Sequence, residues 1–196
     1  MTLSILLVDP DAKRRTRISR SLEGTDCRIA GLAAGPDEAM RIAADAAPDV
    51  ALVAATLGNG SSQHLTDHLS SEHGVPVVLV AAGGLEPLSL GLAVQAGVMG
   101  FLVDPMATAT LRSTLEVAVC RFREFQALRQ EVEVLRRSVE ARKVIERAKG
   151  LLMEVGRLSE SEAYARIRRK SMDTQRPMTE IARAIILSAE VSMKNA

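Results

Sequence analysis

The chain has 196 residues, of which 47% are hydrophobic and 25% are charged, and its formal net charge is +1. This length allows one or two domains, and the apolar content is sufficient for ordinary cores, which excludes a disordered chain. No run of about 18 apolar residues occurs, and the N-terminal stretch turns acidic too early for a signal peptide, so we expect a cytoplasmic protein without membrane spans.

The first half of the chain alternates short apolar runs with helical patterns. The apolar runs predict buried strands at Ser4–Val8, Ile29–Leu32, Val50–Ala54, Val77–Val80 and Gly100–Val103. The helical patterns lie around residues 12–23, 37–46, 61–73, 86–96 and from 107 onward. This alternation predicts an α/β fold, a doubly wound five-stranded parallel sheet, in which ligands sit at the carboxyl ends of the strands.

Four local sequences carry a resemblance to a known domain. They read ILLVDPD at 5–11, PDVALVA at 48–54, VPVVLVAA at 75–82 and AGVMGFLVDP at 96–105. Together they resemble the receiver domain of two-component response regulators over roughly residues 3–118. The resemblance implies a phosphate-accepting carboxylate after the third strand, paired acids for Mg²⁺ after the first, a hydroxyl after the fourth and a lysine near the fifth.

The chain departs from the receiver pattern at each of these positions, which are Pro10, Ala54, Ala81 and Asp104. Ala54 has no nucleophile to accept phosphate, and Asp104 reverses the charge expected to pair with a phosphoryl group. Only Asp9 remains of the adjacent acids that would hold magnesium. We therefore interpret residues 1–118 as a pseudo-receiver that is not phosphorylated, with no metal or other cofactor.

Three acids remain at this edge of the predicted sheet: Asp9, Asp11 and Asp104. We expect them to cap a helix or to be solvated, and residual cation binding is the alternative.

From residue 106 the sequence runs to residue 149 without Gly or Pro and predicts one long helix. Apolar residues recur at a and d positions of a heptad pattern, which predicts a short two-stranded coiled coil in the linker 119–138 and hence a homodimer. The residues expected to dimerise are Phe125, Leu128, Val132, Leu135 and Val139. The alternative is an amphipathic helix that lies on its own domain.

The charges are divided unequally along the chain. Residues 1–110 hold 7 Lys and Arg against 12 Asp and Glu, whereas residues 111–196 hold 18 against 12. The helix over 142–154 combines a cationic face with an apolar stripe, made of Arg142, Lys143, Arg147 and Lys149 and of Ile145, Ala148, Leu152 and Val155. Such a helix either contacts a polyanion or is simply solvated.

Two further helices are predicted after this one. Gly156 can end the first helix, Ser159 and Glu162 form a capping box for the second, and Pro177 suits the first turn of the third. Their expected inner residues are Ala163, Tyr164 and Ile167 in the second helix, and Met178, Ile181, Ala182, Ile185, Ile186 and Ala189 in the third. The result is a three-helix unit over 139–196.

Three sequences in this unit, ERAKGLLM at 146–153, SESEAYARIRRKSM at 159–172 and RPMTEIARAII at 176–186, resemble the ANTAR domain. That domain is the RNA-binding module named after the AmiR and NasR antiterminators, so the resemblance implies binding of RNA hairpins in leader transcripts. Tyr164 either stacks on an unpaired base or lies in the core. The expected RNA-binding residues are Arg147, Ala148, Lys149, Gly150, Tyr164, Arg168, Arg169 and Lys170.

Other candidate sites are weaker. The histidines at 64, 68 and 73 lack further metal ligands and are expected to be solvated, and GNGSS at 58–62 is a poor phosphate cradle. No nucleophile motif occurs, so we expect no enzyme. Cys27 and Cys120 are far apart in sequence and are expected to be free thiols.

The sequences AGVMGFLVDP and VCRFREFQALRQE further resemble the nitrate-assimilation branch of these antiterminators, called NasT. This likeness implies control by a sequestering partner similar to the nitrate sensor NasS. The alternative function is a signalling adaptor whose charged helices bind a protein rather than RNA.

Overall fold

The computed structural model describes residues 2–57, 61–83 and 97–194. The chain divides into two compact units, Met1–Gln126 and Ala127–Ala196. The boundary falls inside the segment 119–138 that the sequence predicts as a linker.

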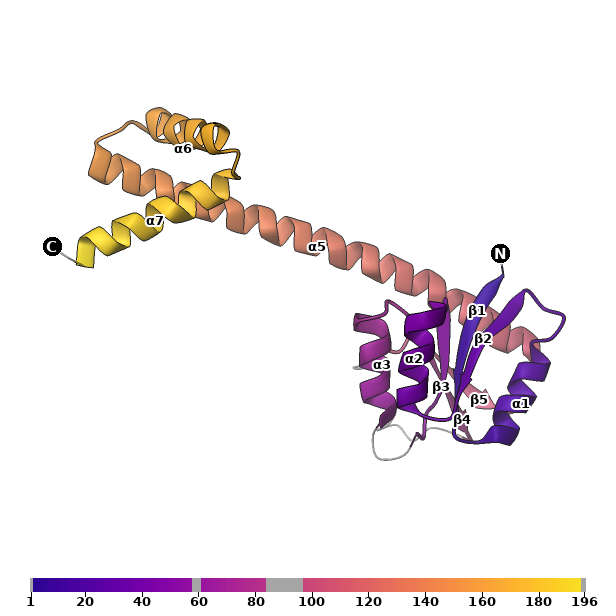
Figure 1. Cartoon of the computed structure of the whole chain (residues 1–196). Helices are drawn as coiled ribbons and strands as arrows, with labels where there is room; N and C mark the ends of the chain where they lie inside the picture. The colour runs from indigo at the N-terminus through magenta and orange to yellow at the C-terminus, as the bar shows by residue number, and fades with distance from the viewer. Residues whose placement is uncertain (1, 58–60, 84–96, 195–196) are drawn as a thin grey trace. The chain divides into compact units, whose positions relative to one another are not determined.

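The described part of the first unit is built on a five-stranded parallel sheet with the order β2-β1-β3-β4-β5 (Figure 1). Its strands are β1 (Leu3–Val8), β2 (Cys27–Ala33), β3 (Val50–Ala54), β4 (Val77–Ala82) and β5 (Gly100–Asp104). The central strands are almost wholly apolar because both of their faces are covered. The predicted doubly wound α/β fold is confirmed.

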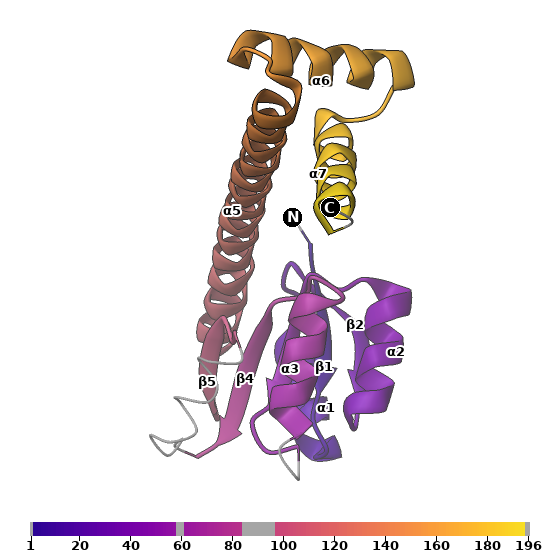
Figure 2. The same ribbon diagram turned by 90° about the vertical axis from the view of Figure 1, so that its left-hand side faces the viewer.

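Helices cover the two faces of the sheet (Figure 2). They are α1 (Ala12–Ser21), α2 (Pro36–Ala46), α3 (Ser61–Ser71) and α5 (Thr108–Gly156). On one face α1 and the N-terminal part of α5 bury Ile18 and Leu115, and on the other α2 and α3 bury Ala43 and Leu69. The helix predicted at 86–96 and most of the predicted loop at 58–62 lie outside the described residues.

Strand β2 is longer than the predicted Ile29–Leu32. It extends at both ends because Leu3 of β1 pairs with Cys27 and Val8 pairs with Ala33. Gly31 within this strand lets α2 approach closely, since a Cβ atom there would lie 2.5 Å from Cγ2 of Ile42.

The second unit consists of the C-terminal part of α5 with α6 (Glu160–Thr174) and α7 (Met178–Lys194). Helix α5 ends at Gly156 as predicted, and the capping box of α6 is complete. The Ser159 hydroxyl accepts from the Glu162 amide at 3.3 Å, and the Glu162 carboxylate accepts from the Ser159 amide at 2.8 Å. Pro177 directly precedes α7, and its carbonyl accepts the amides of residues 180 and 181.

A small core joins these three helices. Ala148, Ile167, Ile181 and Ala182 are buried in it, and Ile145, Leu152, Ile185 and Ile186 pack against them. Two predictions were wrong. Val155 is 78% exposed and lies outside this core, and Tyr164 is 45% exposed although Ala163 and Ile167 of the same helix are buried.

No helix in the described ranges is long and apolar enough to cross a bilayer. Cys27 and Cys120 are free thiols, as predicted.

Candidate functional site

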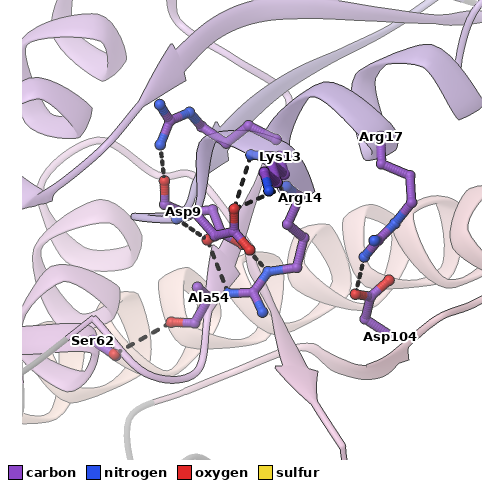
Figure 3. A network of polar contacts seen from close by, with 9 residues as sticks. Asp9, Lys13, Arg14, Arg17, Ala54, Ser62 and Asp104 are labelled. Atoms are coloured by element: carbon purple, nitrogen blue, oxygen red, sulfur yellow. Dashed lines mark hydrogen bonds and ion pairs between the residues drawn. The ribbon is translucent and has the colours of Figure 1, made fainter.

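The positions of the degenerate phosphorylation site meet at the carboxyl edge of the sheet, and Figure 3 shows Asp9, Ala54 and Asp104 among them. Asp9 and Pro10 follow β1, Ala54 ends β3, and Ala81 and Asp104 lie in the paired strands β4 and β5. Strands β1, β3 and β4 are neighbours, so the fold brings together residues far apart in sequence. The side chain of Ala54 is a buried methyl group that cannot accept phosphate.

The carboxylate of Asp9, which would hold a cation in a receiver domain, is bound by an arginine. Asp9 is only 1% exposed, and the guanidinium of Arg14 donates to both of its oxygens, with Nη2 at 2.9 Å from Oδ1 and Nε bound to Oδ2. The hydrogen bond to Asp9 raises the pKa of Arg14 above its usual value. Such a two-pronged contact satisfies a buried carboxylate without a metal ion.

Asp11 and Asp104 have different roles. Asp11 caps α1, since its Oδ1 accepts from the amides of Lys13 at 2.8 Å and Arg14 at 3.3 Å, and these bonds lower the pKa of Asp11. Asp104 accepts a hydrogen bond from Nη2 of Arg17. Capping is therefore confirmed for Asp11, whereas Asp104 and Asp9 are paired with arginines rather than solvated.

The sequence interpretation missed Arg14 and Arg17. Both lie on α1, three residues apart and so on one side of the helix, and Figure 3 shows both guanidinium groups turned toward the acids. Two arginines three residues apart, on the helix that follows the retained Asp9, were the sequence signal that could have revealed these ion pairs. Within the described ranges no group of three His, Cys, Asp or Glu side chains could hold a metal ion.

Hydrogen bonds of Ser62 hold the loop after β3. Ser62 donates from Oγ to the carbonyl of Ala55 at 3.0 Å and accepts from the amide of Leu57 at 3.2 Å. On the same helix His64 and His68 are exposed, as expected, and Nδ1 of His68 lies 2.8 Å from the Glu72 carboxylate.

In the second unit, two residues expected to contact RNA are buried. Ala148 is fully buried against α6 and α7, so its small size serves helix packing. Lys149 is 7% exposed, and its Nζ donates to Glu146 at 2.9 Å and to Glu160 at 2.8 Å. These contacts raise the pKa of Lys149 and connect α5 to the first residue of α6.

The other expected residues are exposed. Arg147 is exposed but donates to Glu190 of α7 at 2.8 Å. A Cβ atom at Gly150 would meet nothing within 4 Å, so the backbone there is open. Tyr164 is exposed and lines a shallow hollow with Lys149 and residues 159–161.

Three successive cations of α6 lie on the surface of the unit. Arg168, Arg169 and Lys170 are all exposed, and no residue in the described ranges forms a salt bridge with any of them. Tyr164 lies one helical turn before Arg168 and therefore on the same side of α6.

The heptad positions of α5 are exposed in the single chain. Phe125, Leu128, Val132, Leu135 and Val139 are between 46% and 61% exposed. A row of exposed, large apolar side chains is typical of a surface that a partner covers.

Comparisons with known proteins agree with this architecture. Residues 133–186 match the family model of the ANTAR domain. The transcriptional regulatory protein PdtaR of Mycobacterium tuberculosis is 30% identical over 182 residues, which cover 93% of this chain and 88% of PdtaR. The nitrate regulatory protein of Klebsiella oxytoca is 32% identical over 83 residues, which cover 42% of this chain and 21% of that protein.

Solved structures support the fold of the first unit. The receiver domain of a modulated diguanylate cyclase from Desulfovibrio desulfuricans has a TM-score of 0.54 at 22% identity and covers 63% of this chain and 98% of its own. A LuxR-family response regulator from Aurantimonas has a TM-score of 0.55 at 23% identity and covers 61% of this chain and 86% of its own. Given the match to PdtaR along most of both chains and the ANTAR match in the last helices, the chain belongs to the family of ANTAR-domain response regulators.

Proposed function

We propose that this chain is a transcription antitermination regulator that binds RNA hairpins in leader transcripts as a homodimer. The observation that carries the proposal is the row Arg168, Arg169 and Lys170, exposed on α6 and uncompensated among the described residues, within the segment that matches the ANTAR domain. Phosphate contacts of this kind supply most of the electrostatic affinity for RNA.

The specificity would come from unpaired bases. An A-form stem hides its base edges in a deep, narrow groove, whereas loop bases can stack on an aromatic ring. Tyr164 is exposed beside Arg168 and suits that role, and the open backbone at Gly150 lets RNA approach α5. Arg147 can also contact RNA if its ion pair with Glu190 is replaced by one with a phosphate. We assign Lys149 and Ala148 to holding the module together.

The dimer would form through the linker 119–138 and the start of the ANTAR domain at 139. The a and d positions from Phe125 to Val139 supply the seam, and valine at a with leucine at d favours two parallel strands. A dimer would present two ANTAR modules to one transcript.

The regulation would not use aspartyl phosphorylation. Ala54 offers no acceptor and Arg14 holds Asp9, so the receiver-like domain (residues 1–118) would serve as a protein-binding platform. We propose a sequestering partner, similar to NasS, as the source of the signal. The similarity to a nitrate regulatory protein supports nitrate assimilation as the process controlled.

The proposal is tested by pulling down RNA with the full chain, sequencing it, and measuring the affinity for the recovered hairpin against salt concentration. Single alanine variants of Arg168, Arg169 and Lys170 should weaken binding and reduce the salt slope by about 0.7 to 0.9 logarithmic units per lost contact. Arg20→Ala removes an equally exposed charge in the first unit and serves as the control. Wild-type binding by all three variants would reject the RNA interface and favour the adaptor function.

A further inference from the structure

The second unit contains an open apolar groove that the RNA interface does not explain. The groove has a volume of about 770 Å³ and lies between the end of α5, the second half of α6 and α7, the three helices of the ANTAR module in Figure 1. Its lining is mostly aliphatic and includes Leu151, Val155 and Ile185. We refer to it as the α5–α6–α7 groove.

Large apolar side chains are exposed to solvent in the groove. Val155 is largely exposed, and Ile185 is only half-buried although it packs against the small core. A concave apolar surface with a polar rim marks a site where another molecule binds.

The rim carries a positive charge. Among the described residues that line the groove, Arg166, Arg169 and Lys170 of α6 are accompanied by one acid, Asp173. An occupant with acidic side chains would therefore meet complementary charge, whereas a second copy placed groove to groove would bring two cationic rims together.

The aliphatic lining of the groove indicates which chemical class of molecule would occupy it. None of the described residues that line the groove is aromatic, and Tyr164 lies outside it. Nucleic-acid bases are usually held by stacking on aromatic rings, whereas aliphatic grooves accept the leucine and isoleucine side chains of an amphipathic helix.

We propose that the α5–α6–α7 groove is the docking site of an acidic amphipathic helix from a partner protein. Docking would cover Arg169 and Lys170, which also belong to the RNA interface, so the helix and RNA would exclude each other. The mutual exclusion of the helix and RNA rests on the proposed function, whereas the docking itself does not.

The test uses the full chain and two labelled synthetic helices of about five turns, roughly 18 residues. Both carry leucine at helical spacing on one face, and the other face carries glutamate in one peptide and lysine in the other. The glutamate peptide should bind, and the lysine peptide should bind at least about tenfold more weakly because it meets the cationic rim.

Two variants locate the site. Ala184→Trp fills the groove from an exposed position on α7 and should weaken the glutamate peptide by at least about tenfold. Arg166→Glu should do the same by reversing a rim charge outside the proposed RNA row. Leu187→Trp, at an exposed position of α7 that does not line the groove, is the matched control and should bind as the unaltered chain does.

The outcomes separate this inference from the proposed function. Displacement of the recovered hairpin by the glutamate peptide supports both. Peptide binding that depends on the groove, in a chain that binds no RNA, supports docking and rejects the RNA function. Failure of the glutamate peptide to bind, binding unaffected by Ala184→Trp, or weakening of the hairpin alone by that variant would overturn the docking proposal.

Discussion

Nζ of Lys149 lies 2.8 Å from Oε1 of Glu160, and this contact joins the C-terminal part of α5 to the first residue of α6. Lys149 also binds Glu146 and is almost fully buried. A lysine held by two carboxylates is poorly placed to bind phosphate, so we assign Lys149 a structural role in the module.

We therefore expect Lys149→Ala to lower the melting temperature of the second unit, because it leaves two carboxylates without their shared cation. The salt dependence of RNA binding should stay unchanged. Lys143→Ala is the control, since Lys143 is an exposed lysine of the same helix that pairs only with Glu140 among the described residues. Thermal melts and salt titrations of both variants check this. A normal melt with a shallower salt slope would show that Lys149 is a phosphate contact.

The stability of the second unit should also decrease at acidic pH. The pKa of Glu160 is lowered by its hydrogen bond from Lys149, and the pKa of Glu162 is lowered by Ser159. Groups with a lowered pKa in the fold stabilise it above their unfolded pKa, and this contribution is lost as pH falls through the folded value. On the alkaline side the pKa of Lys149 is raised by Glu160 and Glu146, so the pair is preserved until pH exceeds the ordinary lysine pKa of 10.5.

Melting temperatures measured by circular dichroism from neutral pH downward should thus fall below about pH 5, and less steeply in Glu160→Gln and Glu162→Gln. Glu154→Gln changes an exposed glutamate that forms no salt bridge within the described ranges, and it should follow the unaltered chain. Identical acid profiles for all the variants would contradict this.

Arg14→Met should destabilise the first unit by about 3 to 5 kcal/mol, because it leaves the buried carboxylate of Asp9 without its cation. Adding Asp9→Asn should recover part of the loss, since the remaining group is then neutral. Lys13→Ala removes an exposed neighbouring charge and should change stability by less than about 0.5 kcal/mol. Denaturant titrations measure all three. Equal effects of Arg14→Met and Lys13→Ala would mean that the pair is not formed in solution.

Acetyl phosphate with magnesium should leave the mass and the oligomeric state unchanged. Restoring the acceptor by Ala54→Asp should not suffice, because Arg14 still holds Asp9 and Asp104 still opposes a phosphoryl group. Intact-protein mass spectrometry gives the answer. An acid-labile gain of one phosphoryl group in the unaltered chain would refute the pseudo-receiver assignment.

Replacing Leu128 and Leu135 with serine should shift the chain toward monomer, because each buried leucine at a d position contributes about 2 to 5 kcal/mol. Val134→Ser is a matched control, since Val134 is equally exposed on α5 but lies off the heptad seam. Sedimentation velocity distinguishes the two. An unchanged dimer in the double variant would place the contact on another surface.

The sequence by itself determined the features that depend on nearby residues. The capping box of Ser159 and Glu162 spans one helical turn, and apolar runs such as Val50–Ala54 reveal buried strands wherever they pair. The loss of the phosphate acceptor is likewise visible from Ala54 alone, because a methyl group cannot react whatever surrounds it.

Only the tertiary structure decided which charged groups meet. Asp104 and Arg17 are 87 residues apart, and Lys149 reaches Glu160 only because α6 folds back beside α5. Helical spacing places Lys149 on a cationic face and Tyr164 near the core, but a side chain one position off the apolar stripe can turn either way. The packing of a neighbouring helix determines which charges are buried with a partner and which remain exposed.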